Sequence, residues 1–275
     1  MALYGETDVP GNVVITGAAS GKAVANAFAK AKCSSLALLD LDEHGLSAVR
    51  ASITEGQKGT ASQAYLYTCD ISNESSVIDT FRKIQHDLGR IDYAVNCAGV
   101  PGPEKPSHEC DANDFDRTIA INLRGIFLCA REEIRMMKGQ SLDAECYPGI
   151  PAVRSQRGAI VNIASGLGVA AMPNTTAYCA SKAGVMALTR SDAVDYSSHR
   201  IRVNSVLPGA TQTPMSHTND TRRQAIEAVA VDVFTPMKRW GKAEEIADVC
   251  LFLCSNKASF VQGVAVPVDG GYLAM

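Results

Sequence analysis

Val13-Val14-Ile15-Thr16-Gly17-Ala18-Ala19-Ser20-Gly21 decides the fold of this chain, because a short β-branched run leads into a glycine turn and then into an alanine-rich stretch. A strand, a glycine turn and a helix in this order are the context in which such a turn binds a dinucleotide. Glycine lets the backbone approach a pyrophosphate, and the following helix offers free N–H groups and the positive end of its dipole. We therefore expect Gly17, Ser20 and Gly21 to contact a nucleotide cofactor.

A carboxylate follows this turn at the distance that suits a ribose. The apolar run Leu36-Ala37-Leu38-Leu39 ends in Asp40, about 20 residues beyond the glycines. There Asp40 can accept hydrogen bonds from the adenine-side ribose hydroxyls, and its charge repels the 2′-phosphate of NADP(H). The sequence therefore favours NAD(H) over NADP(H), with Lys22 as the one nearby cation that could approach a phosphate.

Apolar runs and helical patterns alternate along the chain. The predicted buried strands are Val13–Thr16, Leu36–Asp40, Ala64–Cys69, Ile91–Asn96, Gly158–Ile163, Arg202–Leu207 and Val264–Val268. Helical patterns lie between them, for instance Glu74–Gly89, Asp111–Lys138, Ala177–Ser197 and Lys242–Ser255. Strands that are apolar on both faces and separated by helices indicate a parallel sheet covered on both sides. We expect one domain over residues 1–275, with residues 139–157 as a surface insertion that is either a solvated loop or a contact surface.

Composition excludes several classes of protein. Hydrophobic residues make up 46% of the 275 residues, and the net charge of −3 argues against a nucleic-acid surface. No apolar run approaches the length of a membrane span, and the first residues lack the order of a secretory signal. The nine cysteines show no C-x-x-C pair, and no histidine spacing is typical of a metal site. Buried free thiols, no metal and a cytoplasmic location are the simplest interpretation.

Tyr178 and Lys182 stand four residues apart, which places both side chains on one face of a helix. An ammonium near a phenol favours the phenolate, so the pair is suited to proton transfer near neutral pH. Ser165, further upstream, would add a hydroxyl that holds the reacting oxygen. Taken alone, the same spacing is also compatible with an ordinary surface helix.

These segments, taken in order, resemble the short-chain dehydrogenase/reductase family over nearly the whole chain. The resemblance rests on Thr16 to Gly21, Asp70, Asn96-Cys97-Ala98-Gly99, Asn122, Ser165, the Tyr178/Lys182 pair, Pro208-Gly209 with Thr213, and Val268-Asp269-Gly270-Gly271. It implies a Rossmann-like, doubly wound, seven-stranded parallel α/β sheet with helices on both faces. It also implies an NAD(P)(H)-dependent oxidoreductase that interconverts a secondary alcohol and a ketone.

The resemblance further implies a role for each catalytic position. Tyr178 would be the general acid/base, and Ser165 would position the substrate oxygen. Lys182 would lower the pKa of Tyr178 and contact the nicotinamide ribose. Asn122 would hold a water against Lys182 and so complete a proton relay.

The remaining positions would bind the cofactor. Asp70 would contact the adenine amino group, although it could instead cap the helix that follows. Asn96, Ala98 and Gly99 would line the floor of the adenine ribose site. Pro208, Gly209 and Thr213 would hold the nicotinamide carboxamide, although a Pro-Gly pair also suits an ordinary turn.

The glycine turn departs from the family pattern T-G-x-x-x-G-x-G, because two residues are missing after Gly21. The turn must therefore be remodelled or the helix must begin later, since each residue rotates a helix by about 100°. Lys22 either reaches a phosphate or begins a polar stripe with Asn26 and Lys30. The alternative is a protein with the short-chain dehydrogenase/reductase fold whose cofactor binding is impaired or lost. Its function would be that of a non-redox cyclase, lyase or isomerase. A non-catalytic binding protein is a weaker alternative.

Residues 213–238 are expected to form a flap over the substrate. Their apolar residues, Met215, Val229, Val231, Val233, Phe234 and Met237, suggest a small and largely apolar carbonyl or alcohol substrate, but core packing would explain the same residues. The resemblance also implies a homotetramer or dimer in which the helices of Asp111–Lys138 and Ala177–Ser197 pair across an interface.

Overall fold

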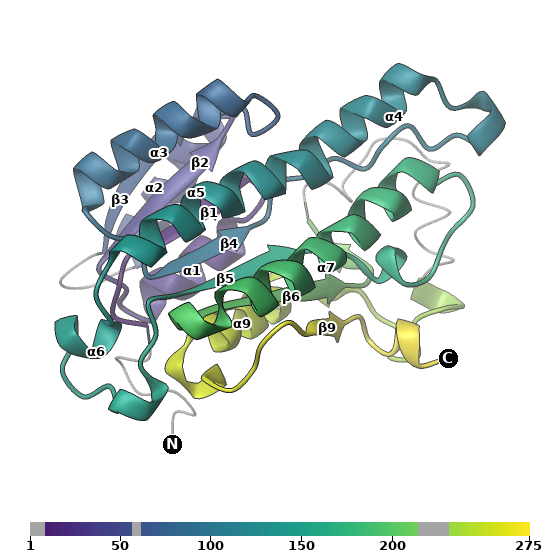
Figure 1. The fold of residues 1–275 in the computed structure, drawn as a ribbon. Coiled ribbons are helices and arrows are strands. Elements are labelled where there is room, and N and C mark those ends of the chain that lie inside the picture. The colour runs from purple at the N-terminus through teal and green to yellow at the C-terminus, as the bar shows by residue number, and fades with distance from the viewer. Residues whose placement is uncertain (1–8, 57–61, 214–230) are drawn as a thin grey trace.

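The computed structural model of the protein describes residues 9–56, 62–213 and 231–275. One sheet of seven parallel strands organises them (Figure 1). From one edge to the other the strands are β3 (Gln63–Thr68), β2 (Ser35–Asp40), β1 (Val13–Thr16), β4 (Tyr93–Asn96), β5 (Gly158–Ile163), β6 (Ile201–Pro208) and β9 (Ala265–Val268). All seven predicted strands are confirmed, and their bounds differ from the prediction by at most two residues.

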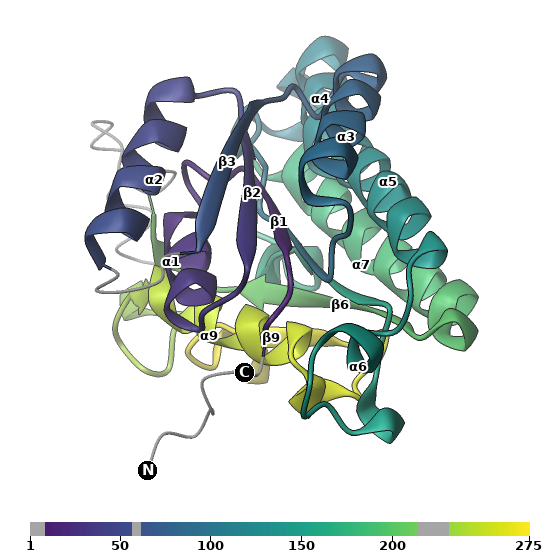
Figure 2. The ribbon, with the colours of Figure 1, turned by 90° about the vertical axis from the view of Figure 1, so that its left-hand side faces the viewer.

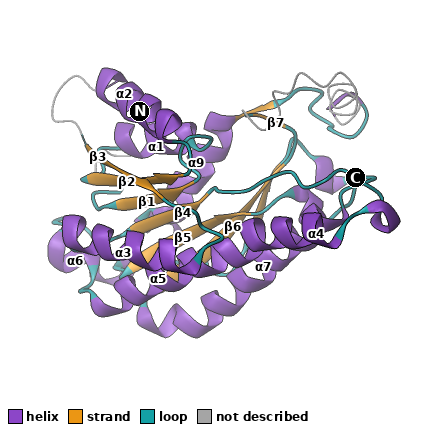
Figure 3. Cartoon of the chain, turned by 90° about the horizontal axis from the view of Figure 1, so that it is seen from above, coloured by secondary structure: helices purple, strands orange, loops and turns teal. Residues whose placement is uncertain are grey.

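Helices cover both faces of this sheet (Figures 2 and 3). One layer contains α1 (Lys22–Lys30), α2 (Glu43–Gly56) and α9 (Ala243–Cys254), and the other contains α3 (Glu74–Leu88), α5 (Ile126–Gly139) and α7 (Thr176–Tyr196). Each layer has its own apolar core, with Phe28 and Leu253 in the first, and Phe81 and Met137 in the second. This is why the strands are apolar on both faces. Among the described residues, no helix has the length and apolarity needed to cross a membrane.

The helix predicted over Asp111–Lys138 is confirmed as an unbroken run of helical residues from Ala112 to Gly139, but its hydrogen-bond register changes within it. It consists of α4 (Ala112–Ile119), a π-helical turn (Ala120–Gly125) and α5. π-helical turns are rare in proteins as a whole, but those that occur are often found at functional sites. There they displace side chains from the regular helical register. Asn122 lies within this turn.

Residues 139–157 form an anchored excursion between α5 and β5. They contain the short helix α6 (Asp143–Cys146) and a 3₁₀ turn (Ala152–Arg154). Asp143 is buried, and its Oδ1 accepts hydrogen bonds from the Ser155 hydroxyl at 2.8 Å and the Gln156 N–H at 3.0 Å. The segment is therefore anchored to the fold through Asp143, and whether it serves as a contact surface stays a prediction.

A buried polar network joins the centre of the sheet to α5 and α7. Asn96 donates to Glu133 Oε2 and to Asn162 Oδ1, both at 3.0 Å, and accepts from Thr16 Oγ1 at 3.2 Å. Asn162 in turn donates to Thr189 Oγ1 at 3.0 Å. Burial raises the pKa of Glu133 to about 8. Such a network is stable only where its members find partners, which makes the strand register specific.

A two-stranded parallel sheet of β7 (Thr211–Gln212) and β8 (Gly241–Lys242) lies beyond β6. The predicted flap falls between these strands, and its residues 214–230, with Met215 and Val229, lie outside the described residues. Of its other apolar residues, Val231 is buried, whereas Val233, Phe234 and Met237 are exposed.

Candidate active site

The predicted site residues gather at the carboxyl ends of the central strands. Gly17 follows β1, Cys97 to Gly99 follow β4, Ser165 follows β5, and Gly209 follows β6. All these strands are parallel, so their carboxyl ends lie along one edge of the sheet. The strand order reverses between β1 and β4, and this switch point is where open α/β sheets bind ligands.

The glycine turn is remodelled rather than followed by a late helix. Gly17 has φ +64°, and a Cβ on it would lie 2.5 Å from Ala98 Cα, so only glycine lets the two loops meet. The Gly21 N–H donates to the Gly17 carbonyl at 2.8 Å, and α1 begins directly at Lys22. The loss of two residues is thus absorbed in a tight turn.

Polar side chains on α1 form the stripe that was one interpretation of Lys22. Lys22 and Lys30 are exposed, and Asn26, halfway between them, accepts a hydrogen bond from Ser52 Oγ at 3.2 Å. Asp40, at the end of β2, holds the turn from the other side. Its Oδ2 accepts from the Ala19 N–H at 2.9 Å, and its Oδ1 accepts from the Asp42 N–H at 3.1 Å.

Asp70 and Asn96 have structural partners in this structure. Asp70 Oδ1 accepts from the backbone N–H of Ser72 at 2.9 Å and from its hydroxyl at 2.7 Å. The N-cap of α3 is Asn73, which accepts from the Ser76 N–H at 3.1 Å, so the capping role considered for Asp70 falls to Asn73. The side chain of Asn96 is fully buried in the polar network of the sheet.

Lys182 and Tyr178 meet on α7 as their spacing predicts. Lys182 is buried, its Nζ donates to the Ile163 carbonyl at 2.8 Å, and the same atom lies 5.7 Å from the centroid of the Tyr178 ring. Burial lowers the pKa of Lys182 to about 8, so the amine is still mainly protonated at pH 7. A buried cation therefore lies near the phenol ring, which is itself only partly buried.

Asn122 and Gly99 close the site around this amine. Asn122 Nδ2 donates to the Val100 carbonyl at 2.9 Å, and its Oδ1 accepts from the Val100 N–H at 2.8 Å. A Cβ on Gly99 would lie 3.3 Å from Asn122 Oδ1 and 3.5 Å from Lys182 Nζ. The π-helical turn thus fixes the loop after β4 close to the lysine.

Ser165 and Pro208 to Gly209 border the other side. Ser165 is buried, and its hydroxyl accepts from the Leu167 N–H at 3.1 Å at the start of a 3₁₀ turn (Gly166–Gly168). Gly209 lies so close to the residue that follows β9 that a Cβ on it would be 2.7 Å from Asp269 Cα. Thr213, the first residue of the predicted flap, is the last residue described before residues 214–230.

Two groups at the site, the Ile163 carbonyl and the Cys97 thiol, have positions that could not be predicted from the spacing of side chains in the sequence. The carbonyl of Ile163 holds the lysine, and a backbone group cannot be recognised from residue type. The Cys97 thiol lies 3.4 Å from where a Cβ on Gly21 would stand, and burial raises its pKa to about 12. Cys97 was part of the motif, but its contact with the glycine turn follows from the approach of two strand ends.

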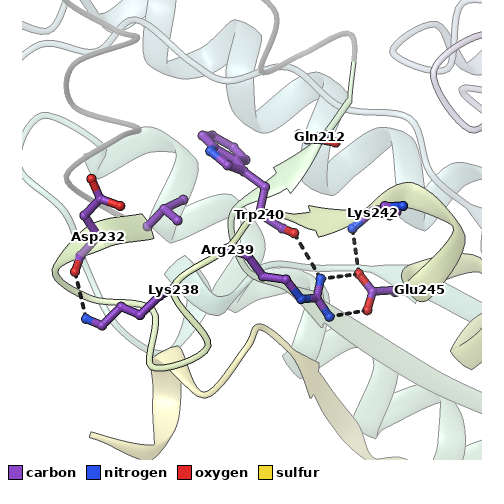
Figure 4. Close-up of a pocket in the computed structure, with 8 residues that line it drawn as sticks. Gln212, Asp232, Lys238, Arg239, Trp240, Lys242 and Glu245 are labelled. Carbon is purple, nitrogen blue, oxygen red and sulfur yellow. Dashed lines mark hydrogen bonds and ion pairs between the residues drawn. The ribbon is translucent and has the colours of Figure 1, made fainter.

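An open cavity of about 810 Å³ lies beyond the end of β6, beside β7 and β8 (Figure 4). Arg239 and Glu245 form a two-pronged ion pair on its wall, with N–O distances of 2.7 and 2.8 Å. Glu245 also accepts a hydrogen bond from the Lys242 N–H at 2.8 Å. The hydrogen bonds from Arg239 lower the pKa of Glu245 to about 2. The pair joins the residues that follow the flap to the start of α9.

The residues at the switch point fit a dinucleotide. The glycines leave a backbone cradle that side chains would fill, and Asp40 supports the turn with its carboxylate. α1 presents its amino-terminal end immediately after Gly21. These are the features that receive a pyrophosphate and a ribose.

Comparison with known proteins agrees with this geometry. The sequence model of a family described as enoyl-(acyl carrier protein) reductase matches residues 17–273. Levodione reductase of Leifsonia aquatica is 36% identical over 272 residues, which cover 95% of this chain and 94% of the relative. Cis-4-hydroxycyclohexanecarboxylate dehydrogenase of Sinomonas cyclohexanicum is 34% identical over 269 residues, with 95% and 96% covered. A crystal structure of NAD⁺-bound xylitol dehydrogenase has a TM-score of 0.80 and 30% identity, with 96% of this chain and 99% of that chain covered. The strand order, the site and these relatives together show that the chain belongs to the short-chain dehydrogenase/reductase family.

Proposed function

We propose that this protein is an NAD(H)-dependent oxidoreductase that interconverts a largely apolar secondary alcohol and the corresponding ketone. The observation that carries the proposal is the buried amine of Lys182 beside the ring of Tyr178, at the sheet edge where Ser165 and the glycine turn also lie. The relatives described above are dehydrogenases and reductases, and they lend no support to a cyclase, lyase or isomerase. One of them is named for a hydroxycyclohexanecarboxylate, which is consistent with a cyclic substrate.

The chemistry of reduction needs one hydride and one proton. A nicotinamide, when bound, supplies the hydride to the carbonyl carbon. Tyr178 donates the proton to the carbonyl oxygen, and the hydroxyl of Ser165 donates a hydrogen bond that positions this oxygen. In oxidation the same groups act in reverse, and Tyr178 accepts the proton of the alcohol.

Lys182 makes this proton transfer possible at neutral pH. Its ammonium favours the ionised form of the neighbouring phenol, which brings a weak acid closer to the working pH. The Ile163 carbonyl holds the amine in place. Asn122 fixes the loop at Val100 beside it, where a water relay to the solvent would begin.

Asp40 is the basis for proposing NAD(H) over NADP(H). It lies at the end of β2 beside the glycine turn and carries a charge that a 2′-phosphate would meet. Lys22 is on the exposed stripe of α1. The preference therefore rests on one carboxylate, and Asp40→Ala is the variant that would relax it.

Assembly and location are also proposed. Phe127 on α5 and Val194 on α7 are exposed apolar residues on the two helices expected to pair between subunits, which supports a dimer or tetramer. All nine cysteines are free thiols, which suits a reducing compartment such as the cytoplasm.

Cofactor titration combined with a Tyr178→Phe variant tests the function. We expect NADH to bind with a micromolar Kd. Energy transfer to NADH from Trp240, the single tryptophan of the chain, measures this binding. Tyr178→Phe should lower kcat for ketone reduction at least about a hundredfold, which is the usual contribution of a general acid, while NADH affinity stays nearly unchanged. Absence of NADH binding at millimolar concentration would contradict the proposal, and retained turnover would remove Tyr178 from its role.

A further inference from the structure

The C-terminal turn of the chain lies at the end of the sheet where α7 begins (Figure 1). This 3₁₀ turn (Tyr272–Ala274) follows β9 and is held by Asp269. The Asp269 carboxylate accepts from the Gly271 N–H and the Leu273 N–H, both at 2.9 Å. Leu273 packs on a cluster that includes Ala164, the residue before Ser165. The position of the turn relative to the catalytic serine is therefore fixed by hydrogen bonds and by packing.

The ring of Tyr272 lies against the residue that follows the catalytic serine. A Cβ on Gly166 would be 3.3 Å from Cδ1 of Tyr272. Burial, with a smaller contribution from the neighbouring Cys179 thiol, raises the pKa of Tyr272. Cys179 directly follows Tyr178 on α7, so the thiol that acts on Tyr272 belongs to the first turn of the catalytic helix.

The other side of the same turn contacts the end of the flap. The Met237 N–H donates to the Gly270 carbonyl at 3.1 Å, and a Cβ on Gly270 would be 2.7 Å from Thr235 Cγ2. Gly271, with φ +92°, lies against the ring of Pro236. The C-terminal turn thus connects the loop of Ser165 with residues 235–237, the last part of the predicted flap.

We propose that Tyr272 forms an aromatic wall of the substrate site and selects alcohols and ketones whose apolar ring lies against it. The inference rests on the proposed alcohol–ketone function and adds the residue that recognises the substrate. Tyr272 is only half-buried, so part of its side chain stays accessible beside Gly166, the residue that follows Ser165. A rigid aromatic face offers a large contact area at a small cost in side-chain entropy, and it favours flat or cyclic apolar partners.

A comparison of cyclic and small acyclic ketones tests this wall. Tyr272→Ala should lower kcat/KM for cyclohexanone about tenfold, equivalent to about 1.4 kcal/mol, and mainly through KM. For acetone the change should stay within about twofold, and Tyr272→Phe should keep the preference because it keeps the ring. Phe260→Ala is the matched control, since Phe260 is a fully exposed aromatic residue before the amino end of β9.

The measurements distinguish recognition of the substrate by Tyr272 from an indirect effect in which Tyr272 only positions the loop of Ser165. NADH affinity and the thermal unfolding temperature are measured for every variant. If the wild-type protein is active, two results for Tyr272→Ala would contradict the role of Tyr272 but not the proposed function. One is an equal loss of kcat for both ketones, and the other is an unchanged preference for cyclohexanone over acetone. A wild-type protein that neither binds NADH nor reduces any ketone would overturn both this role and the proposed function.

A second substitution gives an independent check. Gly166→Ala places a Cβ against the Tyr272 ring and should weaken cyclohexanone turnover by displacing that ring. If the ring is the cause, the effect of Gly166→Ala should be largely lost in the Tyr272→Ala background. Additive losses would contradict the proposal, because they would show that the two residues act separately.

Discussion

Lys182 places a positive charge where the protein is least able to solvate it. The side chain is buried, and its Nζ donates to the carbonyl of Ile163. Burial of a charge costs free energy, and here the cost appears as a pKa lowered to about 8. The residue is therefore expected to reduce stability at neutral pH while it supports proton transfer by Tyr178.

Glu133 is a second buried ionisable group, and the proposed chemistry does not use it. Its Oε2 accepts from Asn96, while its Oε1 has no hydrogen-bond partner among the described residues. Burial raises its pKa to about 8 from an ordinary value of 4.5, and Asp192 adds to the effect. Between these two pH values the folded protein keeps a proton that the unfolded chain has lost.

This difference predicts how stability depends on pH. The contribution of Glu133 is fully present below about pH 4.5 and is lost as the pH rises toward 8, by about 1.4 kcal/mol per pH unit at most. Glu133→Gln should therefore reduce the fall in the free energy of unfolding between pH 5.5 and 8. Urea unfolding at several pH values measures it, with Glu55→Gln, an exposed glutamate on α2, as the control. The same pH slope in Glu133→Gln and the wild-type protein would contradict the assignment.

Among the elements, the shortened glycine turn has the clearest consequence. The N–H of Gly21 is used within the turn, where it donates to the Gly17 carbonyl, and the N–H of Ala19 is used by Asp40. Donors that are satisfied internally are not available to a pyrophosphate. The turn is thus compatible with a dinucleotide, but two of its N–H groups are already used within the protein.

Insertion of Ile-Gly after Gly21 restores the length of the family pattern. We expect the inserted residues to release the Gly21 N–H and to lower the Kd for NADH severalfold, as measured by energy transfer from Trp240. An Ile-Gly insertion after Gly149, in the exposed part of residues 139–157, is the control and should leave the Kd unchanged. Weaker binding after the insertion at Gly21 would show that the tight turn is already suited to the cofactor.

The π-helical turn between α4 and α5 is a second element that affects the site, because Asn122 within it contacts residues distant in the sequence. It presents Asn122 to both backbone groups of Val100, in the loop that follows β4. The same asparagine donates to Ser181 Oγ at 3.3 Å, on the helix that carries the catalytic pair. One residue thereby links three segments that are far apart in the sequence.

At the scale of the whole molecule, the parallel sheet explains why the site is where it is. Strand ends separated by many residues meet at one edge, with a helix layer on each face (Figure 3). α5 and α7 lie in one layer and leave Phe127 and Val194 exposed. Phe127 begins α5 and Val194 ends α7, so they mark two points on the outer surface of this layer that the proposed subunit interface would cover.

A double substitution tests the proposed interface. Phe127→Asp with Val194→Asp places charges on this surface and should reduce the mass measured by size-exclusion chromatography with light scattering. Val153→Asp, at an exposed valine of residues 139–157, should leave the mass unchanged. A wild-type protein that is monomeric at micromolar concentration would contradict the proposed assembly.

The sequence by itself determined the order of the elements, the class of the fold and the pairing of Tyr178 with Lys182. These follow from local rules, because side-chain periodicity reports burial and a spacing of four residues reports one helix face. Only the tertiary structure decided that the Ile163 carbonyl holds the lysine, that the Asn96 side chain belongs to a buried network, and that Tyr272 covers Gly166. Those contacts join segments tens of residues apart, and their partners are set by how the strand ends and loops pack together, which no local spacing encodes.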